Sequence, residues 1–235
     1  MKKSIIIPKQ IVTADNQNKV FKDHAVEIVD GIISKIFPLK EFKSNNYEGN
    51  IVRRDNYTLV PGFVQTHIHL CQTLFRGLAD DMELLDWLQQ KIFPMENSHT
   101  KDSLRSSVQL GINELISGGT TTIVDMGTLR HQEIVFDELH KSNMRAFAGK
   151  CMIDQNELYP LFCESTEENL KTSYEYAKSF HNSNNRKIKY AFAPRFVLSC
   201  TEKLWNGTKE IMKDFEGSFL HTHASENKHE IETVR

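Results

Sequence analysis

The stretch that decides the fold covers residues 61–69 and reads PGFVQTHIH. It places His67 and His69 at the end of an apolar run over residues 59–66, which we expect to form a strand. Side chains two positions apart in a strand point to the same face, about 7 Å apart along the backbone, so the two imidazoles can share one metal ion. The alternative is a pair of histidines with ordinary hydrogen bonds, because a His-x-His motif alone carries a risk of false positives.

From residue 58 onward, apolar runs alternate with amphipathic stretches, which is typical of βα units around a parallel sheet. The expected strands cover residues 59–66, 120–126, 145–153, 188–194 and 218–224, and the expected helices cover residues 84–93, 101–117, 132–141, 165–179 and 201–214. No Gly-rich G-x-G-x-x-G turn follows the first strand, which argues against a doubly wound nucleotide fold. A complete (β/α)₈ barrel typically needs about 250 residues, so the pattern predicts an α/β fold with an incomplete barrel of about five βα units over residues 58–235.

Residues 1–57 show a different pattern, with short apolar runs over residues 4–13, 25–29 and 32–37. Asp30-Gly31 lies between the last two runs. Both central positions of a tight hairpin turn need positive φ, which aspartate and glycine tolerate. The sequence therefore predicts a small β domain over residues 1–57.

Composition excludes several classes of partner. The chain has 235 residues, 29 basic and 31 acidic, and a formal net charge of -2. This balance provides no field that would attract nucleic acid or an anionic membrane. No apolar run reaches about 18 residues and the N-terminus lacks a signal-peptide core, so we expect a cytoplasmic protein whose partner is a small molecule.

A second histidine cluster, with the sequence HTHASE over residues 221–226, stands at the end of the fifth expected strand. Barrel enzymes place catalytic groups at this edge, and histidines from two strands supply nitrogen ligands suited to Zn²⁺ or Fe²⁺. His221 and His223 have the same strand parity, so spacing alone does not choose between them. Glu226 could move a proton between a water and a leaving amine, or could be an ordinary residue at a helix N-terminus.

These segments resemble the amidohydrolase superfamily, and most closely its guanine deaminase and 5'-deoxyadenosine (S-adenosylhomocysteine) deaminase branch. Further segments that carry the resemblance are LLDWL at 84–88, GTTT at 119–122, RAFAGK at 145–150 and APRFVLSC at 193–200. The resemblance implies a distorted (β/α)₈ barrel with a β-sandwich built from both chain ends, of which residues 1–57 would form one portion. It also implies one divalent metal, zinc or iron, and hydrolytic deamination of a purine or purine nucleoside.

The resemblance also assigns roles to individual residues. Its metal ligands correspond to His67, His69 and His223, and its acid/base glutamate to Glu226. Its purine-binding residues correspond to Gln72, Arg195 and Phe196. An amide and a guanidinium can bind a purine edge while a phenyl ring packs on its face, although a loop hydrogen bond, an ion pair and a core position are the alternatives. Triazines or other aminated heterocycles are the runner-up substrates.

The family site also includes a histidine from a sixth strand and an aspartate from an eighth, and neither is found before Arg235. We therefore expect a portion of a deaminase whose remaining strands were lost, are encoded separately or are supplied by a complementing C-terminal chain, and a homo-oligomer is a further possible partner. The alternative is a catalytically incomplete fragment that binds metal or purine or associates with a partner. Asp125, at the end of the second expected strand, could line the pocket or cap the next loop.

Overall fold

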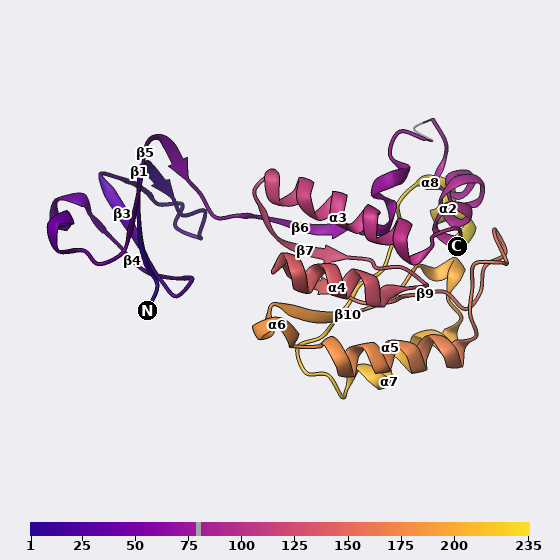
Figure 1. The fold of residues 1–235 in the computed structure, drawn as a ribbon. Helices are drawn as coiled ribbons and strands as arrows, with labels where there is room; N and C mark the ends of the chain where they lie inside the picture. Colours follow the sequence, from indigo (N-terminus) through magenta and orange to yellow (C-terminus); the bar gives the residue numbers. More distant parts are fainter. Residues whose placement is uncertain (79–80) are drawn as a thin grey trace. The chain divides into compact units, whose positions relative to one another are not determined.

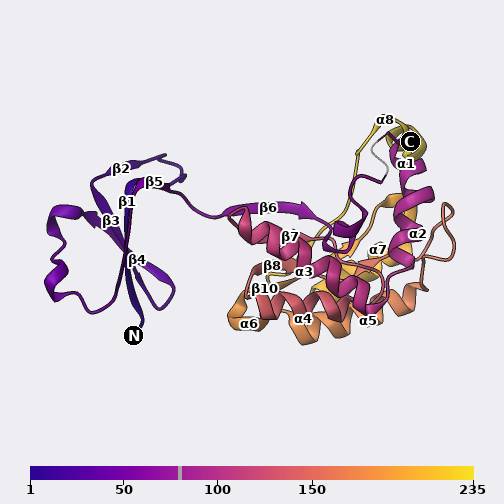
Figure 2. The ribbon, with the colours of Figure 1, turned by 45° about the horizontal axis from the view of Figure 1, so that its top comes forward.

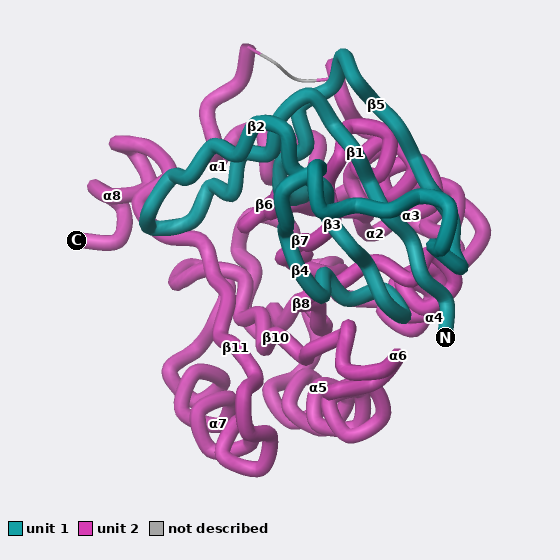
Figure 3. The backbone as a smooth tube through the Cα atoms, turned by 90° about the vertical axis from the view of Figure 1, so that its left-hand side faces the viewer, with its two compact units in different colours: residues 1–62 teal, residues 63–235 magenta. Residues whose placement is uncertain are grey.

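The computed structural model describes residues 1–78 and 81–235 and contains two compact units, residues 1–62 and 63–235 (Figure 3). We expected the domain boundary after residue 57. The difference arises because strand β5, Asn50–Leu59, pairs with the first strand of the chain and so belongs to the N-terminal unit.

The N-terminal unit is a sheet of five strands: β1 (Lys3–Val12), β2 (Val20–Lys22), β3 (His24–Val29), β4 (Ile32–Pro38) and β5. β1 is central, antiparallel to β2 and β3 and parallel to β5. Its alternate side chains Ile5 and Ile7 are buried with Ala25 in a small core. The predicted hairpin is confirmed, because β3 pairs with β4 and both Asp30 and Gly31 have positive φ.

The expected strand over residues 59–66 is wrong at its start. The first strand of the second unit is β6, Phe63–Ile68, and Leu59 ends β5 instead. β5 gave no signal in the sequence because nearly all of its side chains are exposed and many are polar, so no apolar alternation marks it. Its backbone hydrogen bonds to β1 define it.

The second unit is built on a parallel sheet (Figure 1). Its strands are β6, β7 (Thr120–Asp125), β8 (Arg145–Ala148), β9 (Cys151–Met152), β10 (Ile188–Pro194) and β11 (Phe219–Leu220). The order is β11-β10-β8-β7-β6, with β9 also paired to β10, and every pairing is parallel. Successive strands connected by the long helices thus lie side by side, as in the wall of a (β/α)₈ barrel.

Four long helices connect these strands: α3 (Lys101–Ser117), α4 (Gln132–Ser142), α5 (Thr166–Phe180) and α7 (Glu202–Met212) (Figure 2). Their buried apolar residues share one core with the sheet. Thr201 is the N-cap of α7, since its side chain accepts a hydrogen bond from the Leu204 amide. Among the described helices, none combines the length and apolar character needed to cross a membrane.

The helix expected over residues 84–93 is divided and longer. It consists of α1 (Leu84–Trp87), a π-helical turn (Leu88–Ile92) and α2 (Phe93–Asn97). The helical segment continues past Pro94, which lies in the first turn of α2. The missing N–H of proline costs little at this position, because the first N–H groups of an α-helix have no hydrogen-bond partner within that helix. Leu85, Leu88 and Phe93 pack with Phe196 in a second core, so this segment covers the end of β10.

The remaining elements are short. They are 3-10 helices at Leu39–Glu41, Ser44–Asn46, Leu70–Phe75 and Val197–Ser199, together with α6 (Ser183–Arg186) and α8 (Lys228–Val234). Asn184 and Asn185 have positive φ inside α6, so this segment is a tight left-handed turn rather than a regular helix.

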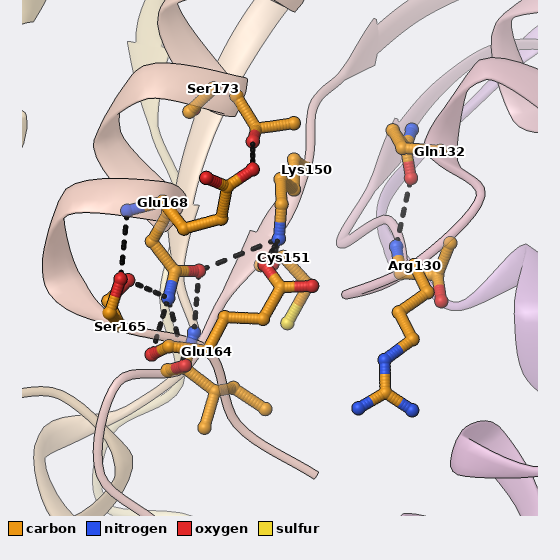
Figure 4. A network of polar contacts seen from close by, with 12 residues as sticks. Arg130, Gln132, Lys150, Cys151, Glu164, Ser165, Glu168 and Ser173 are labelled. Carbon is orange, nitrogen blue, oxygen red and sulfur yellow. Dashed lines mark hydrogen bonds and ion pairs between the residues drawn. The ribbon is translucent and has the colours of Figure 1, made fainter.

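A buried polar network joins the end of β8 to the start of α5 (Figure 4). Asn169 is fully buried, and its side-chain amide donates to the carbonyl oxygens of Ile153, Glu164 and Ser165 at 2.9–3.1 Å. The buried ammonium of Lys150 lies 2.8 Å from the Glu164 carboxylate. The Asn169 side-chain oxygen also accepts a hydrogen bond from the Ile153 amide at 3.2 Å, so this one side chain ties Ile153 to the start of α5.

Replacing Asn169 with alanine should destabilise the protein by about 2–4 kcal/mol, because the Ile153 amide and the Glu164 carbonyl oxygen lose their hydrogen-bond partner inside the protein. Urea unfolding measures the change. Asn206→Ala, on an exposed position of α7, is the matched control and should shift stability by less than about 0.5 kcal/mol. Equal effects of the two substitutions would contradict the role given to the network.

Candidate metal and substrate site

All seven residues that the sequence singled out line one cavity of about 130 Å³. Three apolar side chains from the 84–97 segment complete its wall. The lining residues are His67, His69, Gln72, Leu84, Trp87, Leu88, Arg195, Phe196, His223 and Glu226. The cavity lies at the carboxyl ends of the strands, where side chains from β6, β10 and β11 meet.

His223 reaches the cavity through hydrogen bonds to the end of β10. The strand expected over residues 218–224 is regular only at Phe219–Leu220, but the His223 amide donates to the Arg195 carbonyl oxygen at 3.0 Å. Phe196 and His223 form a further parallel bridge. The fifth strand thus continues in interrupted form and brings His223 to His67 and His69 at the end of β6.

The imidazoles of His67, His69 and His223 each offer a nitrogen, and these three atoms lie within 4.8 Å of one another. The Nε2 atoms of His69 and His223 are 3.1 Å apart. Two ligands of a tetrahedral zinc, with Zn–N bonds of about 2.0–2.1 Å, are about 3.3 Å apart. The donor set and its spacing therefore fit a divalent metal of the zinc type.

His221 lies outside this group of three. Its Nε2 atom is 2.8 Å from Nδ1 of His67, which leaves the other ring nitrogen of His67 for a metal. Spacing in the sequence left His221 and His223 equivalent. The geometry separates them, with His223 in the cluster and His221 beside it.

Burial keeps these imidazoles neutral. It lowers the pKa of His69 well below its usual value, and it lowers the pKa of His221 and of His223 to about 4. The positive charge of Arg195 lowers the pKa of His69 further. Neutral imidazole is the form that binds a metal, so at neutral pH these nitrogens need lose no proton to do so.

Glu226 lies in a loop held by a second carboxylate. Glu230 accepts hydrogen bonds from the backbone amides of Ser225 and Glu226, at 3.3 and 2.8 Å. Burial raises the pKa of Glu226, and the nearby Glu230 carboxylate raises it further. A carboxylate with a raised pKa takes up a proton more readily, as a general base must.

The polar residues expected to hold a purine meet at a carboxylate that the sequence did not single out. Gln72 Nε2 donates to Glu96 at 2.7 Å, and the Arg195 guanidinium forms a buried ion pair with Glu96. Phe196 is buried in the second core and also borders the cavity. Gln72 is therefore hydrogen-bonded, Arg195 is ion-paired and Phe196 is in a core, as the alternatives to substrate binding required. All three residues also line the cavity.

Asp125 caps a loop rather than lining this cavity. Its buried carboxylate accepts hydrogen bonds from the amides of Leu70 and Gly127, at 2.9 and 3.1 Å. Burial raises its pKa to about 7 despite these hydrogen bonds. Asp125 thus holds the backbone immediately after His69. Of the two roles that the sequence left open, it caps a loop and does not line the cavity.

Comparison with known proteins identifies this arrangement. Residues 58–235 match the sequence model of the amidohydrolase family. The chain belongs to the amidohydrolase family. Enzymes of this family generally use a divalent metal, often zinc, and the resemblance noted in the sequence is confirmed.

The amidohydrolase chain is similar to two groups of deaminase. It is 35% identical over 179 residues to a guanine deaminase from Rattus norvegicus, covering 75% of this chain and 39% of that protein. It is 31% identical over 225 residues to a 5-methylthioadenosine/S-adenosylhomocysteine deaminase from Dictyoglomus turgidum, covering 95% of this chain and 50% of that protein. The chain thus spans about half the length, or less, of these relatives.

Solved structures agree on the fold. A guanine deaminase from C. acetobutylicum with bound guanine superposes with a TM-score of 0.88 at 26% identity, over 99% of this chain and 55% of that chain. A triazine hydrolase from Arthrobacter aurescens superposes with a TM-score of 0.82 at 16% identity, over 95% of this chain and 53% of that chain. The second likeness shows a shared fold and gives the triazine alternative no further support.

Metal-free protein should lose stability as the pH falls from about 6.5 to about 4. Histidines of the unfolded chain take up protons near pH 6.5, whereas burial delays protonation of His221 and His223 in the fold to about pH 4. Urea unfolding of chelator-treated protein across this range measures the loss. His221→Asn should flatten the dependence, while the exposed His229→Asn control should keep it. Identical pH profiles for both variants would contradict this assignment.

Proposed function

We propose that this site hydrolytically deaminates a purine or purine nucleoside, of the guanine or 5'-deoxyadenosine type. The observation that supports it best is the meeting of three neutral imidazoles, one carboxylate and a polar cluster in a single cavity. Similar chains are guanine deaminases and 5'-deoxyadenosine deaminases. Because the chain spans only part of their length, the activity of a whole enzyme is part of the proposal.

In this proposal His67, His69 and His223 hold one divalent metal, with zinc favoured and iron also suited to nitrogen donors. Such a metal supplies a water that is acidic enough to act as a nucleophile near pH 7. Glu226 accepts the proton of the attacking water and returns it to the departing amine. Its raised pKa suits both transfers.

The rest of the cavity binds the ring. Gln72 and Arg195 hydrogen-bond its polar edge, and Phe196 packs against its face. Trp87, Leu84 and Leu88 give the cavity an apolar wall on another side. The ring carbon that carries the amine would then face Glu226.

Purified protein should contain one divalent metal ion per chain and release ammonia from guanine, 5'-deoxyadenosine or S-adenosylhomocysteine. Elemental analysis and an ammonia assay measure the two properties. Glu226→Gln should lower turnover by about 10²–10⁴-fold while the metal stays bound, because proton transfer is lost and the ligands are not. Glu232→Gln, at an exposed position of α8, should leave both unchanged.

Two outcomes would count against these assignments. Protein that holds no metal and releases no ammonia from any of the three compounds would rule out the enzyme function for this chain. Loss of metal in the Glu226→Gln variant would show that Glu226 is a ligand rather than a proton carrier.

A further inference from the structure

One buried carboxylate joins the two polar residues of the substrate cavity. Glu96, on α2, has a fully buried side chain, and the Arg195 side chain is only 3% exposed. The guanidinium donates to both carboxylate oxygens, Nη1 to Oε2 at 2.7 Å and Nη2 to Oε1 at 3.2 Å. The same Oε1 accepts the hydrogen bond from Gln72 Nε2 at 2.7 Å. Glu96 therefore links the turn after β6, the end of β10 and the helix that covers them.

The neighbours of Glu96 restrict Arg195 further. The Phe93 ring, also on α2, lies 4.9 Å from the Arg195 guanidinium carbon in a cation–π contact. The Arg195 carbonyl oxygen accepts hydrogen bonds from both the backbone amide and Nδ1 of His223. A shift of Arg195 would therefore disturb both the polar edge of the cavity and one of the proposed metal ligands.

The charge of Glu96 decides which way the Gln72 amide points. An ionised carboxylate only accepts hydrogen bonds, so the NH₂ group of Gln72 must face it. The carbonyl oxygen of Gln72 is then the end left for a ligand. Arg195 uses two of its five N–H groups on Glu96, and because a guanidinium only donates, it can present only donors to the cavity that it lines.

We propose that Glu96 is a positioning residue that sets Gln72 as a hydrogen-bond acceptor and Arg195 as a donor at the polar edge of the substrate cavity. The matching ligand is a heterocycle that carries an N–H donor next to an acceptor. The kind of ligand named in this inference rests on the proposed function, whereas the arrangement of Glu96, Gln72 and Arg195 does not. Glu96 itself contacts neither the ring nor the reacting atoms.

The decisive substitution is Glu96→Gln, which keeps the shape of the side chain and removes its charge. The new amide can donate as well as accept, so the Gln72 amide is free to turn over and the guanidinium loses its counter-ion. We expect KM for guanine to rise at least about 10-fold, with a smaller change in kcat and an unchanged metal content. A merely structural role would lower the active fraction, and hence kcat, without raising KM.

The chain offers a closely matched control. Glu138 is also buried, and it accepts hydrogen bonds from an arginine, Arg105, and from the side-chain amide of Gln109. It joins α3 to α4 and is absent from the residues that line the cavity. Glu138→Gln should therefore leave KM unchanged even if it lowers stability.

A measurement on the wild-type protein separates this inference from the proposed function. The NH₂ protons of Gln72, followed by NMR, should exchange slowly with water in the wild type and rapidly in the Glu96→Gln variant. If no compound is deaminated but these protons are protected, the proposed function fails and the positioning role stands. Rapid exchange in the wild type, or an unchanged KM in a folded Glu96→Gln variant, would overturn the role of Glu96. The wild-type measurement decides the matter even if the variant does not fold.

Discussion

The site depends on the hydrogen bonds between the Arg195 carbonyl oxygen and His223. The backbone amide and the Nδ1 atom of His223 both donate to this one oxygen, at 3.0 and 2.8 Å. They extend the short pairing of β10 with β11 beyond its last regular residue, Leu220. Because the Arg195 side chain points to Glu96, one residue couples the histidine cluster to the polar edge of the cavity.

The electrostatics of the cavity follow from the same arrangement. A buried guanidinium would be costly alone, and Glu96 offsets its charge within the protein. The surrounding imidazoles are kept neutral by burial, so they add no further positive charge. At Glu226, burial and Glu230 raise the pKa while Arg195 lowers it. Burial and charges of both signs thus act together on the carboxylate that we propose as the proton carrier.

Local sequence patterns predicted the helices and strands that are defined by their own apolar periodicity and end signals. The helix over 101–117 and the strand over 188–194 have the expected bounds, because one is amphipathic and ends before Gly118 and the other is a buried apolar run. The seven site residues came from short motifs and a family resemblance, and they line one cavity. β5 was missed because backbone pairing alone defines it. Glu96 was missed because its partners lie 24 and 99 residues away.

Whereas Glu96 binds side chains, two other buried carboxylates accept hydrogen bonds from backbone amides beyond the ends of strands. Asp125 holds the Leu70 amide just after His69, and Glu230 holds the amides of the loop that carries Glu226. At these points the chain has left its strand, so sheet hydrogen bonds no longer satisfy the backbone. An acceptor supplied by another element satisfies these amides and at the same time sets the loop in place. The loops that follow His69 and carry Glu226 are therefore held by Asp125 and Glu230, which belong to no recognisable sequence motif.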